Sequence, residues 1–193
     1  MVRAILGGHK TQTRRIVAKS RSAVGSGRWE DLDFSSPITW TDGDATGPGC
    51  AEYLHVPTAT GDGCIHRVYS RTSCGDRLWV RETWMETMPP GMAWKYRADR
   101  DRPEWAGLWR PSIHMPRAAS RLALAVESVR VERLQAITEE DAYAEGVAGT
   151  LPEDTADSAR DEFRILWDTI SGRRATWDSD PWVWVVGFSV VPA

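Results

Sequence analysis

Apolar and polar positions alternate most clearly over residues 121–135. Leu122, Leu124 and Val126 fall on one parity, and Val129 and Val131 fall on the other. Strict alternation is typical of a half-buried β-strand, and a change of parity inside it indicates a bend or bulge, here near residues 127–128. The pattern therefore predicts one long, strongly curved strand of the kind found in small barrels.

Other apolar stretches predict further strands. Residues 78–84 are rich in aromatic and β-branched side chains and follow a Gly75-Asp76 turn, and residues 181–191 form the continuous apolar run of a buried closing strand. A Gly-Asp-Gly turn at 61–63 separates residues 52–57 from residues 64–70, which predicts a hairpin.

Three segments predict helices. Residues 2–6 can form one or two turns that end at a glycine pair, and residues 137–147 have a natural N-cap in Thr138, three acids in the first turn and an exit at Gly146. A third, amphipathic helix begins near residues 154–155 and stops at Gly172. Strands mixed with a few helices predict an α+β fold with a small curved sheet or barrel.

The length of 193 residues suits a single domain, 1–193. Turn and helix-breaking residues are dense at about 17–74 and about 85–116, which we expect to be irregular insertions. No apolar run approaches the roughly 18 residues that would span a membrane, and the N-terminus has no export signal. We therefore expect a cytoplasmic protein without a membrane partner, whose oligomeric state stays open.

Charge is unevenly distributed. The net charge is −3, yet residues 1–28 hold seven Lys/Arg and no acid, whereas residues 138–162 hold nine acids and one arginine. A local basic face for nucleic acid therefore stays open. The chain has 11 Trp and three Phe; indole rings suit either a core or the stacking of a nucleobase, and core packing is favoured for each.

The three cysteines, Cys50, Cys64 and Cys74, are odd in number and lack an export context, which predicts free thiols. His55 and His66 lie close by in sequence and could in principle join them around zinc. The C-x-x-C spacing of structural zinc sites is absent, so we expect no metal and no other cofactor.

The stretch from Gly7 to Arg15 reads Gly-Gly-His-Lys-Thr-Gln-Thr-Arg-Arg and has no hydrophobic stripe. It is either a solvated basic turn or part of a ligand site, since paired glycines let the backbone approach a ligand closely. Glu145 lies three residues after Ala142, on the small apolar side of its predicted helix. That position places its carboxylate either at the rim or in the interior.

These pieces, in this order, resemble the ASCH domain, a branch of the PUA-like superfamily, in the long form found in phage proteins. The resemblance rests on the motif Gly8-His9-Lys10-Thr11-Gln12-Thr13-Arg14-Arg15 and on residues 75–84, 111–117, 137–147 and the closing strand. It implies a small β-barrel flanked by helices, with a cleft for a nucleotide or nucleic acid. Similar proteins usually carry a strand before the first helix, which this sequence lacks.

The resemblance also implies an activity. A small bacterial member of the superfamily is an amidohydrolase that converts N4-acetylcytidine to cytidine and acetate with a lysine, a threonine and a glutamate, which match Lys10, Thr13 and Glu145. Thr13 would be the nucleophile, Lys10 its base, and Glu145 the group that passes a proton to the leaving nitrogen or orients Lys10. An ordinary ion pair between Lys10 and Glu145 stays open as the alternative.

Further residues could line the same cleft and bind substrate: Arg14, Arg15, Arg81, Glu82, Trp84, His114 and Arg117. For His114, a packed position in the interior is the default expectation. The alternative function is a non-catalytic RNA- or DNA-binding module, or a nuclease, in which Lys10, Arg14, Arg15 and Arg117 contact phosphates. Phosphate binding should weaken steeply with salt, whereas nucleoside hydrolysis should not.

Overall fold

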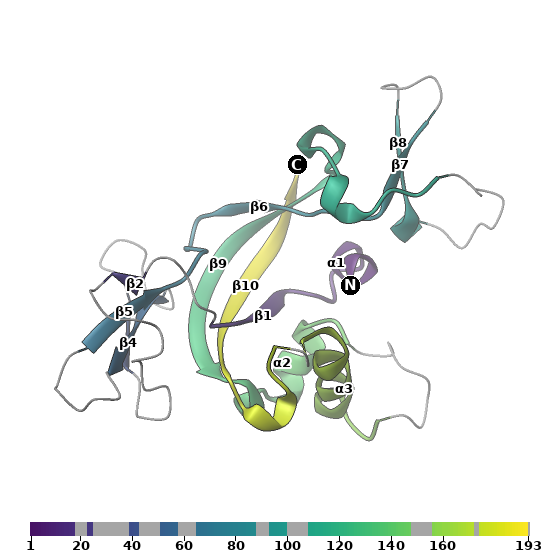
Figure 1. The fold of residues 1–193 in the computed structure, drawn as a ribbon. Coiled ribbons are helices and arrows are strands. Elements are labelled where there is room, and N and C mark those ends of the chain that lie inside the picture. Colours follow the sequence, from purple (N-terminus) through teal and green to yellow (C-terminus); the bar gives the residue numbers. More distant parts are fainter. Residues whose placement is uncertain are drawn as a thin grey trace.

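A curled, antiparallel sheet forms the centre of the molecule. The computed structural model describes residues 1–17, 23–24, 39–42, 51–57, 65–87, 93–99, 108–147, 156–171 and 174–192. Four strands are ordered β1-β10-β9-β6: β1 (Gln12–Ile16), β10 (Trp182–Pro192), β9 (Leu122–Arg133) and β6 (Arg77–Trp79). Figure 1 shows β9 and β10 bending together into a half-barrel. The fold thus mixes α and β structure, with few helices.

A β-bulge in β9 accounts for much of the curvature. Gly187 pairs with Ser128 whereas Phe188 pairs with Val126, so Glu127 is one extra residue on β9. An extra residue bends its strand and switches the side-chain parity beyond it. This confirms the bend that the alternation predicted near residues 127–128.

The two faces of the curled sheet pack against different layers, because residues directly opposite in an antiparallel pair share a face. Thr13 pairs with Val186, which pairs with Val129, and this face forms a core with Leu54 and Val56. The second sheet, which lies on the convex side of β9 and β10 in Figure 1, has the order β2-β5-β4-β3: β2 (Ala23–Val24), β5 (Ile65–Tyr69), β4 (Ala51–Pro57) and β3 (Thr39–Asp42).

This second sheet lies within the segment 17–74. The pairing of β4 with β5 confirms the predicted hairpin. The segment is therefore more regular than its turn-rich sequence indicated, since four of its short stretches pair into a sheet. Single apolar residues such as Leu54, Val56 and Val68 bury this sheet against the central one, and so few contacts leave only a weak pattern in the sequence.

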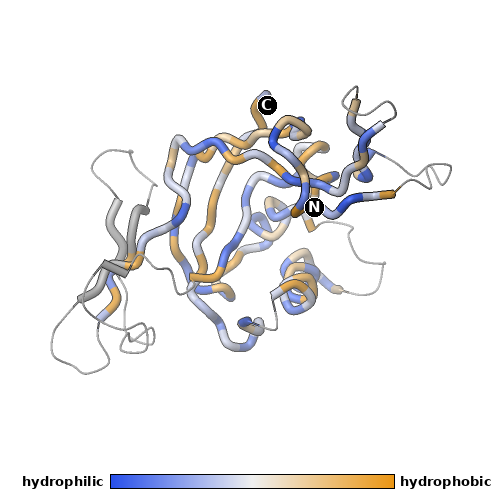
Figure 2. The backbone as a smooth tube through the Cα atoms, turned by 45° about the horizontal axis from the view of Figure 1, so that its top comes forward, coloured by the Kyte–Doolittle hydropathy of each residue, from blue (hydrophilic) through white to orange (hydrophobic). Residues whose placement is uncertain are grey.

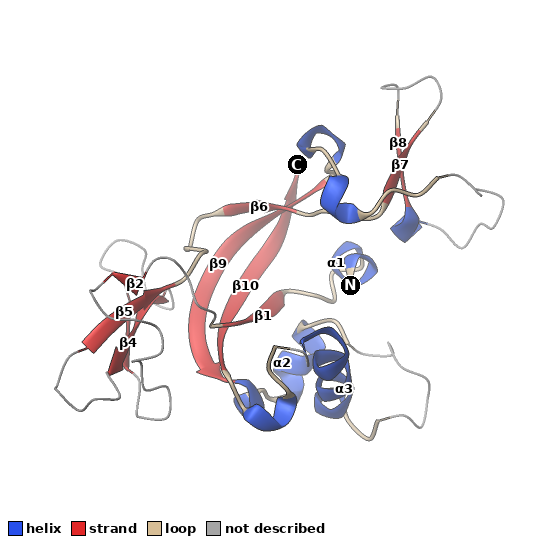
Figure 3. Ribbon diagram, viewed as in Figure 1, coloured by secondary structure: helices blue, strands red, loops and turns tan. Residues whose placement is uncertain are grey.

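Helices cover the concave face, as Figure 3 shows. They are α1 (Val2–Leu6), α2 (Glu139–Ala144) and α3 (Ala159–Ser171). Val183 and Val185 on this face of β10 pack against Phe163 and Trp167 of α3. Thr138 caps α2, since its side chain accepts a hydrogen bond from the backbone N–H of Asp141 at 3.1 Å. The predicted cap is confirmed; the predicted start of α3 at 154–155 and its stop at Gly172 lie outside the described residues.

Above the half-barrel, a two-stranded hairpin forms a smaller layer from β7 (Trp84–Glu86) and β8 (Trp94–Tyr96). The strand predicted over 78–84 is thus divided, because β6 ends at Trp79 and β7 begins at Trp84 in another sheet. Trp84 is buried against Met115 and Ala119, in agreement with the core role favoured for it. Short 3₁₀ turns complete the described structure: Arg97–Asp99, Ser112–His114, Arg117–Ala119, Leu134–Ala136 and Trp177–Ser179.

Figure 2 shows both hydrophobic and hydrophilic stretches along the backbone of the curled sheet. Among the described helices, none has both the length and the apolar character needed to cross a membrane.

One cysteine differs from its prediction. Cys74 is disulfide-bonded, so the expectation of three free thiols is wrong. An odd number of cysteines leaves one unpaired but still permits a bridge between two others that the fold brings together. Cys50 and Cys64 lie outside the described residues. Within the described ranges, no three His, Cys, Asp or Glu side chains are grouped so as to hold a metal ion.

Candidate functional site

Lys10 and Glu145 meet although 135 positions separate them. Lys10 Nζ donates to Glu145 Oε2 at 2.7 Å and to the Glu145 backbone oxygen at 2.7 Å, and the two residues are only 3% and 6% exposed. They also form an isolated antiparallel bridge. The contact joins the segment that precedes β1 to the end of α2.

Glycine at position 146 permits this approach. Gly146 has φ of +76°, which side-chain-bearing residues rarely adopt, and a Cβ there would lie 2.8 Å from Ala4 Cβ and 2.8 Å from Lys10 Cβ. Backbone bonds fix the same junction, since Lys10 N–H donates to Ala4 O at 3.0 Å and Thr11 N–H to Ala144 O at 2.8 Å. The ends of α1 and α2 are thereby held against Lys10.

Arg14 is the second buried cation of the site. Its side chain is 1% exposed and contacts three carboxylates: Nη1 donates to Glu145 Oε1 at 3.2 Å, Nη2 to Asp141 Oδ2 at 2.9 Å, and Nε to Glu132 Oε1 at 3.1 Å. A second bond joins Nη2 to the same Glu132 oxygen. Substrate binding was the predicted role of Arg14, but its guanidinium donates four hydrogen bonds to carboxylates inside the protein.

Two more polar residues extend the network toward solvent. Arg130 donates to both Asp141 oxygens at 2.9 and 3.0 Å and to Glu132 Oε2 at 3.3 Å, and Gln12 donates its amide N–H to Asp141 Oδ1 at 2.9 Å. Three cations therefore face three carboxylates: Lys10, Arg14 and Arg130 against Glu132, Asp141 and Glu145. Such balance is what allows charges to remain ionised in an interior.

Two pKa values in the network are displaced. Burial lowers the pKa of Lys10 below its ordinary value, and this effect outweighs the opposing attraction of Glu145. Burial alone would raise the pKa of Asp141, but the hydrogen bond from Gln12 and the charges of Arg14 and Arg130 hold it below its ordinary value. Lys10 is thus more easily deprotonated than a surface lysine.

A cavity of about 470 Å³ opens beside Lys10. Three lining residues carry hydroxyls, Thr11, Ser128 and Ser189, and none of these hydroxyls has a hydrogen-bond partner within the described part of the chain. A Cβ at Gly187 would overlap Ser128 Oγ, so glycine at this position keeps the floor of the cavity open. The full lining is Gly8, Lys10, Thr11, Gln12, Glu127, Ser128, Arg130, Gly187, Phe188, Ser189 and Val190.

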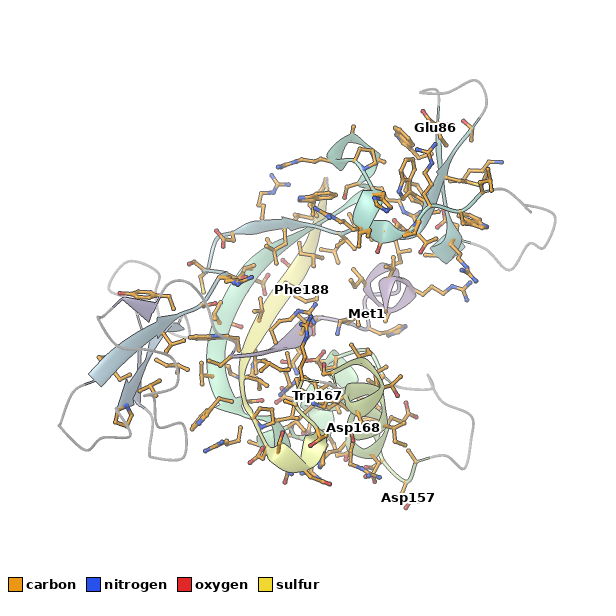
Figure 4. All side chains as sticks on the ribbon, viewed as in Figure 1. Met1, Glu86, Asp157, Trp167, Asp168 and Phe188 are labelled. Atoms are coloured by element: carbon orange, nitrogen blue, oxygen red, sulfur yellow. The ribbon has the colours of Figure 1, made fainter. Side chains whose placement is uncertain are left out.

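Phe188 forms the apolar border of the cavity. Its ring packs with Ile5 of α1 and with Leu122 and Leu124 of β9, and Figure 4 shows it between the curled sheet and α1. The cavity therefore combines one apolar wall with a row of hydroxyls and the two cations Lys10 and Arg130.

Thr13 does not join this site. It pairs with Val186, on the face of β1 that packs toward the second sheet, whereas Gln12 and Arg14 occupy the opposite face. Thr13 is also absent from the cavity lining. The structure thus brings Lys10 and Glu145 together and leaves Thr13 on the other side of the strand; Arg15 shares that side and is exposed.

The remaining predicted binding residues lie elsewhere. Glu82 is buried and accepts two hydrogen bonds from Arg121, at 2.8 and 3.0 Å. It lines a separate cavity of about 310 Å³ together with Arg3 and Arg97. Trp84 is enclosed in the core described above. Neither Glu82 nor Trp84 lines the cavity beside Lys10.

A third group lies on the surface. Arg81 stacks on Trp79, with its guanidinium carbon 4.5 Å from the ring centroid, and donates to Ile113 O at 3.2 Å. Arg117 is exposed. His114 is exposed as well, so the default of a packed histidine is wrong there: its 3₁₀ turn has no buried residue.

Sequence reasoning missed most of the charge network. The missed residues occupy alternate positions of two strands. They are Gln12, two residues before the predicted Arg14 on β1, and Ser128, Arg130 and Glu132 on β9. The sequence signal that could have found them is the polar residue at every second position, alternating with Val129 and Val131. In a strand whose valines point to one core, the residues that alternate with them point to the other face.

Comparison of the chain with protein-family models, with curated proteins and with solved structures gives no match in any of the three. The geometry of the site and the resemblance of its motif therefore carry the functional argument.

Proposed function

We propose that the protein hydrolyses the N4-acyl amide of modified cytosine nucleosides, converting N4-acetylcytidine to cytidine and acetate in the cavity beside Lys10. The observation that supports this most is the 2.7 Å contact between Lys10 Nζ and Glu145, two of the three residues that the ASCH resemblance assigns to catalysis. The curled half-barrel with few helices agrees in outline with a PUA-like fold.

Lys10 is the general base of this proposal. Its lowered pKa increases the fraction of neutral amine at neutral pH, and a neutral amine can accept the proton of a nucleophilic hydroxyl. As the hydroxyl oxygen bonds to the acyl carbon, its proton passes to Nζ. The same proton then moves to N4 as the carbon–nitrogen bond breaks, which releases cytidine. Water hydrolyses the resulting ester to acetate, and Glu145 keeps Nζ in place throughout.

Two threonines compete for the role of nucleophile. The resemblance assigns Thr13, whereas the geometry favours Thr11, which is solvent-exposed and lines the cavity together with Lys10. For Thr13 to act, its side chain would have to cross from the face of β1 that contacts Val186 to the face that holds Arg14. We therefore assign Thr11 as the nucleophile.

The test is to incubate the protein with N4-acetylcytidine and follow cytidine release by chromatography. Lys10→Met and Glu145→Gln keep side-chain volume. The first should lower kcat by about 10²–10⁴-fold, the usual effect of losing a positioned acid or base, and the second should lower kcat because the charged partner that holds Nζ is lost. Thr11→Val and Thr13→Val form a matched pair, of which only the first should abolish turnover. A folded wild-type protein that releases no cytidine would refute the proposal.

A non-catalytic role in binding RNA or DNA is the second candidate. The segment 108–126 contains no acid, and its Arg117 and His114 are exposed near Arg81. Arg81→Gln with Arg117→Gln should weaken oligonucleotide binding and reduce its salt dependence if this surface contacts phosphates. Tight oligonucleotide binding without cytidine release would favour this candidate over the amidohydrolase.

A further inference from the structure

We propose that Arg14 is a positioning residue, which holds the Glu145 carboxylate so that one of its oxygens faces Lys10 and thereby acts on Lys10 without touching substrate. This inference rests on the amidohydrolase proposal for its catalytic meaning. Its structural content, a coupling of Arg14 to Lys10 through Glu145, can be tested without any turnover.

One carboxylate serves two cations here. Glu145 Oε2 accepts from Lys10 at 2.7 Å, and Oε1 accepts from Arg14 at 3.2 Å. A carboxylate held from both oxygens cannot rotate about its terminal bond without losing one partner. The position of Oε2 beside Lys10 therefore depends on the hydrogen bond from Arg14 to Oε1.

Arg14 is itself fixed. Glu132 and Asp141 bind its Nε and Nη2 donors, and a guanidinium presents its five N–H groups in a rigid plane, so these anchors determine where Nη1 points. The side chain is 1% exposed and Arg14 does not line the cavity. Direct contact with a substrate in that cavity is excluded by this burial.

The charge around Lys10 shows what removal of Arg14 would do. Charged groups approach Lys10 from α2 (Glu145), from β1 (Arg14 and Arg15) and, across the cavity, from β9 (Arg130 and Glu127). The remaining neighbour, α1, approaches through the backbone of Ala4. Without Arg14, one positive charge near Lys10 would be lost, which favours the ammonium form. The pKa of Lys10 should therefore rise.

The chain is well suited to a direct measurement, because it contains only three lysines, Lys10, Lys19 and Lys95. With ¹³C-labelled lysine, the three Cε signals can be followed by NMR over a pH titration and assigned with Lys19→Arg and Lys95→Arg. In Arg14→Met, the titration midpoint of Lys10 should rise by about one pH unit, the lower end of the usual effect of a neighbouring charge.

Matched variants separate positioning from charge loss in general. Arg14→Lys retains the positive charge, so the Lys10 midpoint should stay closer to wild type than in Arg14→Met. It lacks the planar fork that holds Oε1 of Glu145, so kcat should still fall. Arg164→Met removes an exposed arginine of α3 that forms an ion pair with Asp161, and it should not move the midpoint. Arg14→Gln, which keeps a hydrogen-bond donor, replaces Arg14→Met if the latter does not fold.

Activity provides the second readout. In Arg14→Met, the acid limb of kcat/KM should move to higher pH together with the Lys10 midpoint, and turnover should recover at high pH with KM little changed. Loss from a merely structural defect would not recover in this way. An unchanged Lys10 midpoint in both Arg14→Met and Arg14→Gln overturns the inference, whether or not the wild type is active. A shifted midpoint in a protein that releases no cytidine upholds the inference and refutes the proposed function.

Discussion

Replacing Gly146 by alanine tests the junction that brings Lys10 to Glu145. Two costs are expected. The first is the conformational cost of a side-chain-bearing residue at φ of +76°, about 1–2 kcal/mol. The second is steric, because the new Cβ would lie 2.8 Å from both Ala4 Cβ and Lys10 Cβ, neither of which can rotate away. Overpacking of this kind costs about 1–3 kcal/mol.

Gly75 offers a matched control. It has φ of +86°, but a Cβ there would meet no atom within 4 Å. Gly75→Ala therefore carries the conformational cost without the clash, and the conformational entropy that alanine removes from the unfolded chain is common to both variants. The difference in free energy of unfolding between Gly146→Ala and Gly75→Ala should be about 1–3 kcal/mol, which is the steric part alone.

Urea unfolding followed by tryptophan fluorescence measures this difference, and the Cε signal of Lys10 reports whether its contact with Glu145 survives. Gly146→Ala should lower the unfolding midpoint more than Gly75→Ala and should displace the Lys10 signal. Equal destabilisation by the two substitutions would show that Gly146 is needed only for its backbone angle, and the close approach of α1, α2 and Lys10 would then be wrong.

Three further outcomes follow from the described geometry. Thr138→Ala should destabilise the protein by about 1 kcal/mol in urea unfolding, whereas Thr138→Ser should not, because only the first removes the cap of α2. Gly187→Ala should destabilise through its clash with Ser128 Oγ, and adding Ser128→Gly should restore most of the loss, a coupling that a double-mutant cycle measures. Because the pKa of Asp141 is lowered in the folded state, its ionised carboxylate stabilises the fold at pH values above its unfolded pKa of about 3.9. The deficit of Asp141→Asn in urea unfolding at pH 7 should therefore begin to shrink as the pH falls below about 4 and continue to shrink toward the lowered folded-state pKa.

The local features of this fold could be predicted from the sequence. The change of parity in 121–135 located the bulge at Glu127, and Thr138 and Gly146 marked the ends of α2. These signals are readable because alternation and capping arise between residues close in the chain. The hairpin of β4 and β5 was likewise marked by its own turn.

The strand β1 could not be predicted in this way. Its buried positions are Gln12 and Arg14, which a sequence pattern treats as solvated, so the sequence indicated a basic turn or a ligand site there and no strand. Burial of Arg14 is stable only because Glu132, Asp141 and Glu145 surround it, and these carboxylates come from β9 and α2. A strand whose inward side chains are charged has no hydrophobic signature.

The composition of the site was decided by tertiary structure for the same reason. The sequence by itself supplied a motif with Lys10 and Thr13 and a carboxylate at Glu145. The family resemblance grouped the lysine with the glutamate, and the structure places these two side chains in contact. Which side chains share a cavity depends on strand register, because neighbouring residues of a strand point to opposite faces. The pairing of β1 with β10 turns Thr13 toward the second sheet and Arg14 toward Glu145, and no property of residues 7–15 alone could fix that choice.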